Sequence, residues 1–369
     1  MNNNPLLTLG QLGQSPWYDY ITRELLKSGR LTKLITDDGL RGMTSNPTIF
    51  EKAISGSEDY DEDIRRLLAS AQEPAEIFDA LSIADVRAAC DSFRPTYEAL
   101  SGHDGLVSIE VNPELAGDTQ ASIAEAARLW KAVSRPNLMV KIPGTAAGIP
   151  AIEESLAAGI NINITLLFSV DRYLEVSEAF LRGLERRRAA GQPIDRLASV
   201  ASFFVSRVDA KVDPLLDQQG DSAGLRGTIA IANAATAYAA FQRSRETPRW
   251  QALAAAGARP QRPLWASTST KDPRYSDTHY IEPLVAPHTV TTLPPETLDA
   301  YRDHGKPEIR IATTIAQAPD RLRALAAQGI DLAEITRSLE VEGVAKFAES
   351  YQKLLRGIEA KAAALVGER

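Results

Sequence analysis

A single lysine lies in the middle of an otherwise apolar run of residues. Positions 136–144 read PNLMVKIPG, and Lys141 carries the only charge in this segment. Successive side chains of a strand point to opposite faces, so Lys141 shares a face with Met139. A buried ammonium needs a compensating charge or must lose its proton, and a neutral amine can attack a carbonyl carbon to form a Schiff base. The alternative is an edge-strand lysine whose stem reaches to water, and this segment by itself favours that alternative.

Isolated polar side chains also lie next to other apolar segments. Asp19 follows Trp17, Asn46 precedes a proline, and Glu110 lies within an apolar run. Each has a purely structural alternative: a helix N-cap for Asp19, a turn residue for Asn46 and an exposed strand face for Glu110. These polar residues would be unrelated only if every one of the structural alternatives were true at once. We therefore favour a shared site.

A further strand carries a row of polar residues. Residues 160–165 alternate with isoleucine, and the polar members are Asn161, Asn163 and Thr165. A face with two amides and a hydroxyl is too polar to fill a barrel core without hydrogen-bond partners. Ser202 lies on the strand expected at 198–205 and is a candidate for the same site.

Strands and helices alternate along the chain. Strands are predicted near Trp17, within 41–47, at 106–111, 138–142, 160–165, 198–205 and 263–267, with a last short one within 284–290. Residues 1–16 are expected to be irregular. Helices are expected at 59–71, 74–80, 82–101, 119–134, 145–158, 169–190, 224–256 and 333–366.

This alternation predicts parallel βαβ units. About eight strands favour an α/β fold, a (β/α)8 TIM barrel with helical insertions and a C-terminal helix. A doubly wound sheet is the alternative, but no G-x-G-x-x-G or Walker loop follows a strand. Because no linker or low-complexity tract interrupts the chain, we expect a single domain over 1–369.

The composition excludes several classes of function. The chain has 44% hydrophobic residues, a net charge of -7, no basic block and no apolar run of membrane-spanning length. We therefore expect neither a nucleic-acid nor a membrane partner. The lone Cys90 and a start without a secretory signal favour the cytoplasm. The four histidines are scattered, with no H-x-x-x-H or C-x-x-C pair, so we expect no metal site.

The C-terminal ends of different barrel strands are where catalytic side chains are found in this fold, and the polar residues above lie there. The sequence resembles the transaldolases, which are Schiff-base enzymes, and it is similar to their longer subfamily. The resemblance covers nearly the whole chain and rests on TSNPTIF at 44–50, VSIEV at 107–111, LMVKIPGT at 138–145, NINITLLFS at 161–169 and SFFVSRVD at 202–209.

The resemblance implies catalytic roles for four residues. Lys141 would form the Schiff base, and Asp19 would be the acid/base during carbon–carbon cleavage. Glu110, together with Thr165, would hold the water that carries protons during imine formation. No cofactor is implied, since the imine itself accepts electrons.

The resemblance also implies residues that bind the substrate. Three would bind the hydroxyl groups of the dihydroxyacetone unit: Asn46, Asn163 and Ser202. Arg207 would bind the sugar phosphate. A second phosphate-binding arginine is expected two residues after the serine matched by Ser267; Ser269 occupies that place, and the next cation is Lys271.

Three functions are compatible with this pattern. A transaldolase would convert sedoheptulose 7-phosphate and glyceraldehyde 3-phosphate to erythrose 4-phosphate and fructose 6-phosphate, in the non-oxidative pentose phosphate pathway. The alternative is a lyase like the fructose-6-phosphate aldolases. These carry tyrosine at the position of Phe204, which argues for the transferase. A sugar-phosphate-binding barrel without catalysis would not need Lys141, Asp19 and Glu110 together. Sugar phosphates are the expected partners, and both monomer and homodimer remain open.

Overall fold

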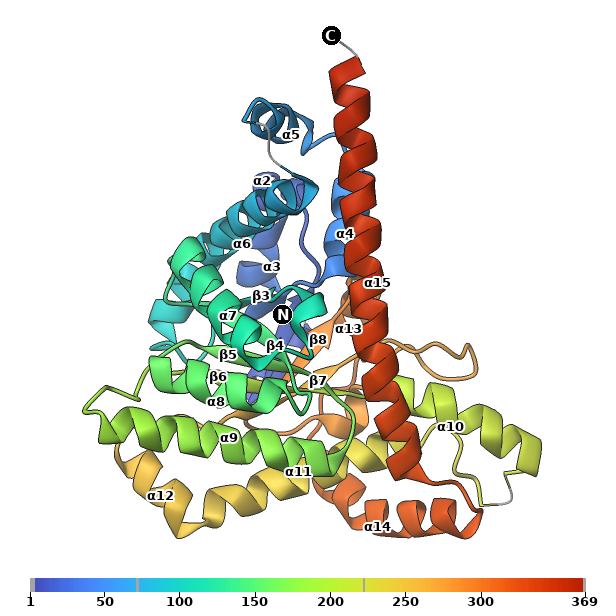
Figure 1. Cartoon of the computed structure of the whole chain (residues 1–369). Helices are drawn as coiled ribbons and strands as arrows, with labels where there is room; N and C mark the ends of the chain where they lie inside the picture. The colour runs from blue at the N-terminus through green and yellow to red at the C-terminus, as the bar shows by residue number, and fades with distance from the viewer. Residues whose placement is uncertain (1–3, 71–72, 222, 368–369) are drawn as a thin grey trace.

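The computed structural model describes residues 4–70, 73–221 and 223–367. Eight parallel strands close into one barrel, in which each strand pairs with its sequence neighbours and β8 pairs with β1 (Figure 1). The strands are β1 (Gln14–Asp19), β2 (Gly42–Thr44), β3 (Leu106–Glu110), β4 (Leu138–Pro143), β5 (Ile162–Leu167), β6 (Ser199–Phe204), β7 (Arg262–Ala266) and β8 (Thr289–Leu293). This confirms the predicted (β/α)8 barrel, and the alternative of a doubly wound sheet is wrong.

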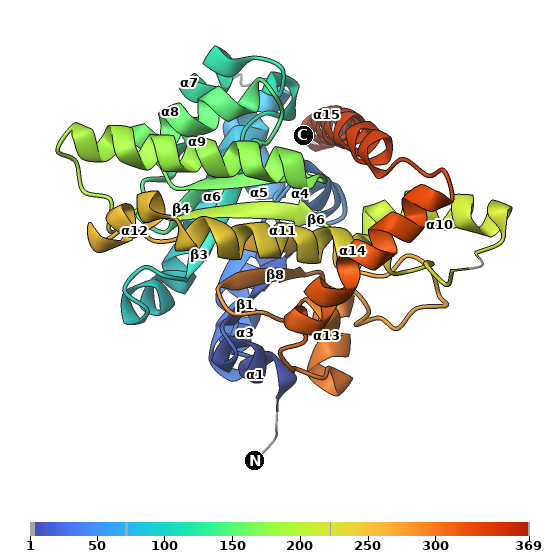
Figure 2. The same ribbon diagram turned by 90° about the horizontal axis from the view of Figure 1, so that it is seen from below.

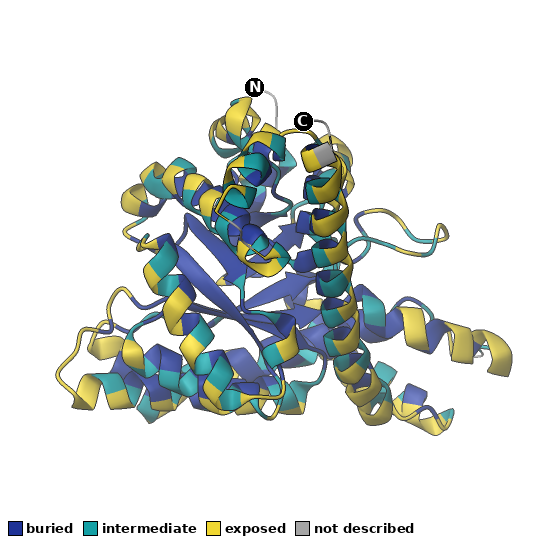
Figure 3. Cartoon of the chain, turned by 45° about the horizontal axis from the view of Figure 1, so that its top comes forward, coloured by how far each residue is buried: buried dark blue, intermediate teal, exposed yellow. Residues whose placement is uncertain are grey.

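Helices surround the barrel on its outside. They are α1 (Pro5–Gln11), α2 (Arg23–Lys27), α3 (Arg30–Asp37), α4 (Pro47–Ser55), α5 (Asp61–Leu68), α6 (Pro74–Ala99), α7 (Thr119–Val133), α8 (Gly148–Ala158), α9 (Val170–Ala189), α10 (Ser206–Gln219), α11 (Ile229–Glu246), α12 (Pro248–Ala255), α13 (Pro295–His304), α14 (Ile311–Ala327) and α15 (Leu332–Gly367). Figure 3 shows the strands as a buried interior, while the exposed residues lie on the outer faces of the helices. Within the described residues, no helix combines the length and apolar character needed to cross a bilayer.

The predicted C-terminal helix is confirmed as α15. It runs along one side of the barrel in Figure 1 and contacts α4, α6 and α10, which come from distant parts of the chain. Because α15 also contacts β5, it lies close to the barrel strands themselves. The expectation of a single domain over 1–369 stays a prediction.

Several boundaries differ from the expected ones. Residues 1–3 of the segment expected to be irregular lie outside the described residues, and the rest, 4–16, is not irregular: it contains α1, which Asn4 caps by accepting a hydrogen bond from Leu6 N at 3.0 Å, and the start of β1. Figure 2 shows α1 beside α13, so its buried leucines find partners that the local sequence does not reveal. The last strand begins at Thr289, and a short 3-10 helix precedes it at Glu282–Leu284.

Other helices are joined or divided differently from the prediction. The helices expected at 74–80 and 82–101 form one helix, α6. The long helix expected at 224–256 is two helices, α11 and α12, because Pro248 lacks the N–H that a continuing helix needs. Thr247 caps the new helix by accepting from Trp250 N at 3.2 Å. Helix α10 was not among the helices expected from the sequence.

Candidate active site

A cavity of about 410 Å³ opens at the C-terminal ends of the strands. We call it the mouth cavity. Nine of the residues singled out from the sequence line it: Asp19, Asn46, Lys141, Thr165, Ser202, Phe204, Arg207, Ser267 and Lys271. These side chains come from segments spread over more than 250 positions, and barrel closure brings their strand ends together. The two remaining candidates, Glu110 and Asn163, lie behind its wall.

Lys141 and Glu110 form a buried ion pair. Their strands pair in register, so that Glu110 lies directly beside Lys141. Lys141 Nζ is 3.1 Å from Glu110 Oε2, and the two side chains are only 7% and 3% exposed. The same Nζ lies 3.4 Å from the carbonyl oxygen of Ser45 and 5.5 Å from the centre of the Phe347 ring. The amine is thus held in place by a carboxylate, a carbonyl and an aromatic face. The alternative of an edge-strand lysine reaching to water is wrong.

Burial raises the pKa of Glu110, and the Asp19 carboxylate adds to that effect. The Lys141 charge and its hydrogen bond act in the opposite direction. Among the described residues, Glu110 Oε1 and Thr165 Oγ1 are both buried without a hydrogen-bond partner. These two oxygen atoms can therefore each form a hydrogen bond to a small polar group beside the lysine.

Asp19 is the last residue of β1, and its carboxylate accepts a hydrogen bond from Thr44 Oγ1 at 2.7 Å. Burial raises the pKa of Asp19, while the charge of Lys141, the Thr44 hydroxyl and the Arg207 guanidinium partly offset this effect. Asp19 is not a helix cap, because Thr22 caps α2 by accepting from Leu25 N at 3.2 Å. Its carboxylate is thus available to exchange a proton with a ligand.

Asn46 serves two purposes in the structure. Its Oδ1 caps α4 by accepting a hydrogen bond from Ile49 N at 3.0 Å, which agrees with the structural alternative considered from the sequence. The residue also lines the mouth cavity. The cap fixes the direction of the side chain, so its amide group has a defined orientation at the cavity wall.

Asn163 lies one layer below the cavity surface. Ser202 Oγ donates to Asn163 Oδ1 at 2.6 Å, and Asn163 Nδ2 donates to Ser108 Oγ at 3.0 Å. In this structure the amide of Asn163 therefore orients Ser202, which does line the cavity.

The third polar residue of this strand has a different position. Asn161 precedes β5 and bonds the backbone of its neighbours through Pro136 O, Leu138 O and Ala198 N. This buried amide links adjacent segments and lies outside the cavity lining. Asn161 thus has the hydrogen-bond partners that a polar strand face needs, and only Thr165 of the three polar residues lines the mouth cavity.

Cations gather at one side of the mouth cavity. Arg207 lies in the first turn of α10, with its guanidinium carbon 5.1 Å from the centre of the Phe204 ring. Burial lowers the pKa of Arg207, and the Asp19 charge raises it. Lys271 Nζ donates to Ser269 Oγ at 2.7 Å, and burial, Arg207 and Lys52 all lower the pKa of Lys271 against the effect of Glu296. An anion between these cations would be held by direct charge attraction.

Two backbone positions near the site are strained. Leu166 and Ser267 adopt positive φ angles of 61° and 54°, which non-glycine residues rarely do. The first lies where the register between β5 and β6 shifts, directly after Thr165. The second places Ser267 Oγ 3.0 Å from Ser206 Oγ at the start of α10. Ser267 is itself a residue of the cavity lining, and strained backbone is common at binding sites.

A sequence model of the Transaldolase/Fructose-6-phosphate aldolase family matches residues 16–358. The chain belongs to this family. A transaldolase of Acidothermus cellulolyticus is 52% identical over 359 residues, 96% of this chain and 96% of that protein. One of Parafrankia sp. is 49% identical over 356 residues, again 96% of both. One of Trichodesmium erythraeum is 44% identical over 373 residues, 98% of both.

Some residues of this transaldolase-family cavity were not expected from the sequence. The structure adds Tyr20, Thr48, Ile49, Lys52 and Glu296, together with Phe347 from α15. Phe347 could be recognised from its helical spacing only as a buried apolar residue. Its place above Lys141 depends on how α15 crosses the barrel, which no local pattern encodes. Lys52 lies one helical turn beyond Thr48 on α4, so the two residues share a helix face. This spacing was only a weak indication that Lys52 lines the cavity.

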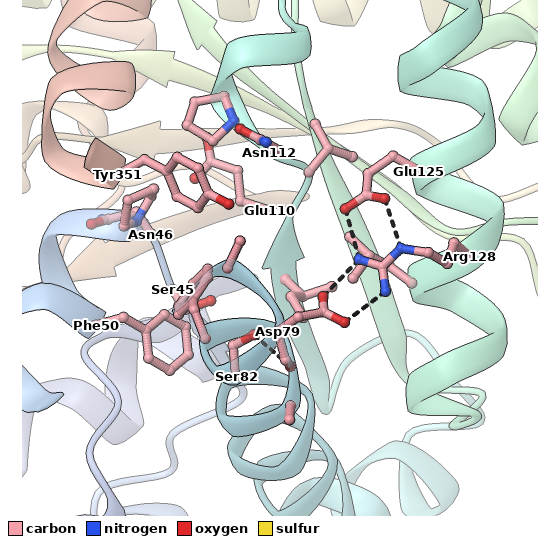
Figure 4. Close-up of a pocket in the computed structure, with 18 of the residues that line it drawn as sticks. Ser45, Asn46, Phe50, Asp79, Ser82, Glu110, Asn112, Glu125, Arg128 and Tyr351 are labelled. Carbon is pink, nitrogen blue, oxygen red and sulfur yellow. Dashed lines mark hydrogen bonds and ion pairs between the residues drawn. The ribbon is translucent and has the colours of Figure 1, made fainter. Parts of the chain in front are cut away.

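A second cavity of about 520 Å³ lies on the other side of Glu110. Figure 4 shows Glu110, Asn46 and Ser45 at one wall and the network of Asp79, Arg128 and Glu125 at another. Arg128 donates to both of these carboxylates, so its charge is already paired. Asn46 lines both cavities, and Glu110 lines only this one. In this transaldolase-family barrel, Glu110 is therefore part of the partition between the two cavities.

Proposed function

We propose that this enzyme is a transaldolase that transfers a dihydroxyacetone unit from sedoheptulose 7-phosphate to glyceraldehyde 3-phosphate. The products are erythrose 4-phosphate and fructose 6-phosphate. The family and the names of the full-length relatives support the type of reaction. The observation that supports the mechanism most directly is the buried Lys141–Glu110 pair at 3.1 Å, beside a cavity with cations at its opposite side.

The first step joins the substrate to Lys141. Once the amine has given up a proton, its lone pair attacks the ketone carbon, and the carbon–nitrogen bond forms. The ketone oxygen takes up two protons and leaves as water, which produces a protonated imine. Glu110 is 3.1 Å from the amine, within reach to accept and return these protons. Glu110 Oε1 and Thr165 Oγ1 have free hydrogen-bonding capacity for the departing water.

The second step cleaves the bond between the third and fourth carbons. Asp19 takes the proton of the hydroxyl group on the fourth carbon, and the electrons of the breaking bond flow into the imine. An aldose leaves, and an enamine remains on Lys141. The imine nitrogen accepts the electrons, so the mechanism requires no metal. The raised pKa of Asp19 increases its affinity for this proton near neutral pH.

The phosphate group would bind at the cationic side of the mouth cavity. Arg207 can present two parallel N–H groups, and the hydroxyls of Ser206 and Ser267 lie 3.0 Å apart next to it. Ser269 stands where a second arginine is expected, and Lys271 is the next cation; the Arg207 charge lowers the pKa of Lys271, which indicates that the two cations are close. Asn46 and Ser202 would bind the hydroxyl groups of the three-carbon unit, with Asn163 orienting Ser202.

Phe204 favours transfer over simple cleavage. Its ring packs against Phe168 at 5.2 Å between centres and lies under Arg207, and the side chain itself carries no hydroxyl group. A hydroxyl here could protonate the enamine or position a water, as a lyase requires. We expect the enzyme to act in the cytoplasm on free sugar phosphates, without a nucleic-acid partner. The sequence leaves monomer and homodimer open.

Borohydride trapping tests the mechanism. Reduction in the presence of fructose 6-phosphate should leave a three-carbon adduct on Lys141 and inactivate the enzyme, with the position read by mass spectrometry. Lys141→Ala should abolish both adduct and activity, whereas Lys52→Ala, in the same cavity, should keep the adduct. An adduct on another lysine, or activity that survives Lys141→Ala, would contradict the proposal.

A further inference from the structure

A third cavity, of about 330 Å³, lies at the N-terminal end of the barrel, opposite the mouth. We call it the basal cavity. Residues at the starts of β1, β3, β6 and β7 contribute to its wall. Its ionisable residues are Arg41, His103, Asp104, Arg245, Arg259, Arg262 and His288. Four guanidinium groups and two imidazoles thus face one carboxylate, in a protein whose net charge is -7.

The single carboxylate of the basal cavity is fully engaged. Asp104 accepts hydrogen bonds from Ser15 Oγ and from Trp17 Nε1, the latter at 2.8 Å. Arg262 donates to both oxygens of Asp104, each at 3.2 Å. This network closes the bottom of the barrel and neutralises Arg262. Asp104 therefore forms no ion pair with the other three arginines.

Those three arginines have no carboxylate within ion-pair distance in the part of the chain that the structure describes. Arg259 donates to Ser101 O at 2.6 Å, but its Nη1 is buried without a partner. Arg245 lies 5.5 Å from the centre of the Phe241 ring, and its Nε is likewise buried and unpartnered. Buried N–H groups without an acceptor are rare in proteins, because each one costs free energy.

The cations also act on one another. Burial and the charges of Arg259 and Arg262 lower the pKa of His103. Burial lowers the pKa of Arg259 as well, with Asp195 offsetting part of the effect of its cationic neighbours. The basal cavity is therefore a concave region of positive potential with free donors.

We propose that the basal cavity binds a phosphate group, either as inorganic phosphate or as part of a small metabolite. Guanidinium groups offer paired N–H donors that match phosphate oxygens, and the cavity volume suits a small ligand. A concave site on a negatively charged protein favours a small anion over a nucleic acid. Strands of five or six residues separate this site from the mouth cavity by roughly 15–20 Å.

The proposal does not depend on the reaction at the mouth. Without an anion, three like charges repel one another, which lowers the stability of the fold. A phosphate bound here would relieve that repulsion and stabilise the folded state in proportion to its occupancy. Binding at this site should therefore appear as a rise in melting temperature even when the mouth cavity cannot bind phosphate.

The experiment measures melting temperature and binding heat in the full-length Arg207→Ala protein, which weakens phosphate binding at the mouth. Inorganic phosphate and fructose 6-phosphate are titrated at constant ionic strength set with chloride. We expect saturable stabilisation in this background and an affinity at least about tenfold lower after Arg259→Gln or Arg245→Gln. Arg188→Gln, which removes an exposed charge elsewhere, should have no effect. Equal affinity for both probes indicates recognition of phosphate alone, and tighter binding of the sugar phosphate that is lost after Arg259→Gln indicates a metabolite at the basal cavity.

Three results would overturn the proposal. One is loss of all stabilisation in Arg207→Ala, which would place all binding at the mouth. Another is an equal loss of phosphate affinity in Arg259→Gln and Arg188→Gln, which would indicate general ionic screening. The third is the absence of saturable binding to a folded protein. Because the two substitutions at the basal cavity remove separate side chains, a folding defect in one leaves the other as the test.

Discussion

Removing the Thr44 hydroxyl should change the pH dependence of catalysis. Thr44 Oγ1 donates to the Asp19 carboxylate at 2.7 Å, and this bond favours the ionised form against the opposing effect of burial. Thr44→Val keeps nearly the same shape and removes only the donor. Asp19 must be ionised to accept the hydroxyl proton during cleavage. The substitution therefore makes the active form of the base harder to reach at low pH.

The magnitude follows from the character of the bond. A hydrogen bond to a charged group contributes about 1.5–3 kcal/mol. About 1.4 kcal/mol of difference between protonation states corresponds to one pH unit, so the acidic limb of kcat/KM should move upward by about one to two units. Below that limb, activity should fall by about 10- to 100-fold, while activity on the plateau changes little.

The assay is the pH profile of kcat/KM for transfer from fructose 6-phosphate to erythrose 4-phosphate. Borohydride trapping on Lys141 is measured in parallel, because imine formation precedes the step that needs Asp19. Thr48→Val is the matched control: Thr48 lines the same cavity, but its hydroxyl bonds to Ser350 Oγ at 2.9 Å. An acidic limb that stays in place in Thr44→Val, or moves equally in both variants, would refute the reasoning.

Three further predictions concern partitioning, phosphate binding and stability. Phe204→Tyr should raise release of free dihydroxyacetone relative to transfer, by about tenfold if the hydroxyl contributes about 1.4 kcal/mol, and an unchanged product ratio in a folded variant would count against it. Arg207→Ala should raise KM for phosphorylated donors far more than it affects unphosphorylated dihydroxyacetone, and equal effects on both would reject the phosphate role. Burial raises the pKa of Asp209 to about 7, above its value of about 3.9 in unfolded chains. Its contribution to stability is thus fully present below about pH 4 and is lost as pH rises through 7. Asp209→Asn, which can keep the bonds to Ala230 N and Tyr280, should flatten that loss between pH 5 and 8 in urea unfolding; parallel curves for both proteins would contradict it.

Local patterns were sufficient for the barrel and for much of its site. The run around Lys141 identified β4 because period-two alternation depends only on neighbouring residues. The positions of polar residues near strand ends followed from the same alternation, and eight polar candidates line one cavity together with Phe204. The element types were also predictable, since strands and helices have different apolar periods. The motif stretches then indicated the family, which the match over residues 16–358 confirms.

Tertiary contacts decided what those patterns could not. Helix α1 is stabilised by packing against α13, which comes from a distant part of the chain. The position of Asn163 behind Ser202 required the strands to be placed in register.

The sequence by itself determined which residues lie on strands, which faces they share and which family they belong to. The tertiary structure alone decided that Glu110 pairs with Lys141 and that Phe347 lies over that amine. It also decided that arginines with no carboxylate partner among the described residues meet below the barrel. The physical reason is the sequence separation over which each kind of interaction acts. Periodicity and capping act between residues a few positions apart, whereas these contacts join residues tens to hundreds of positions apart that meet only after the barrel closes.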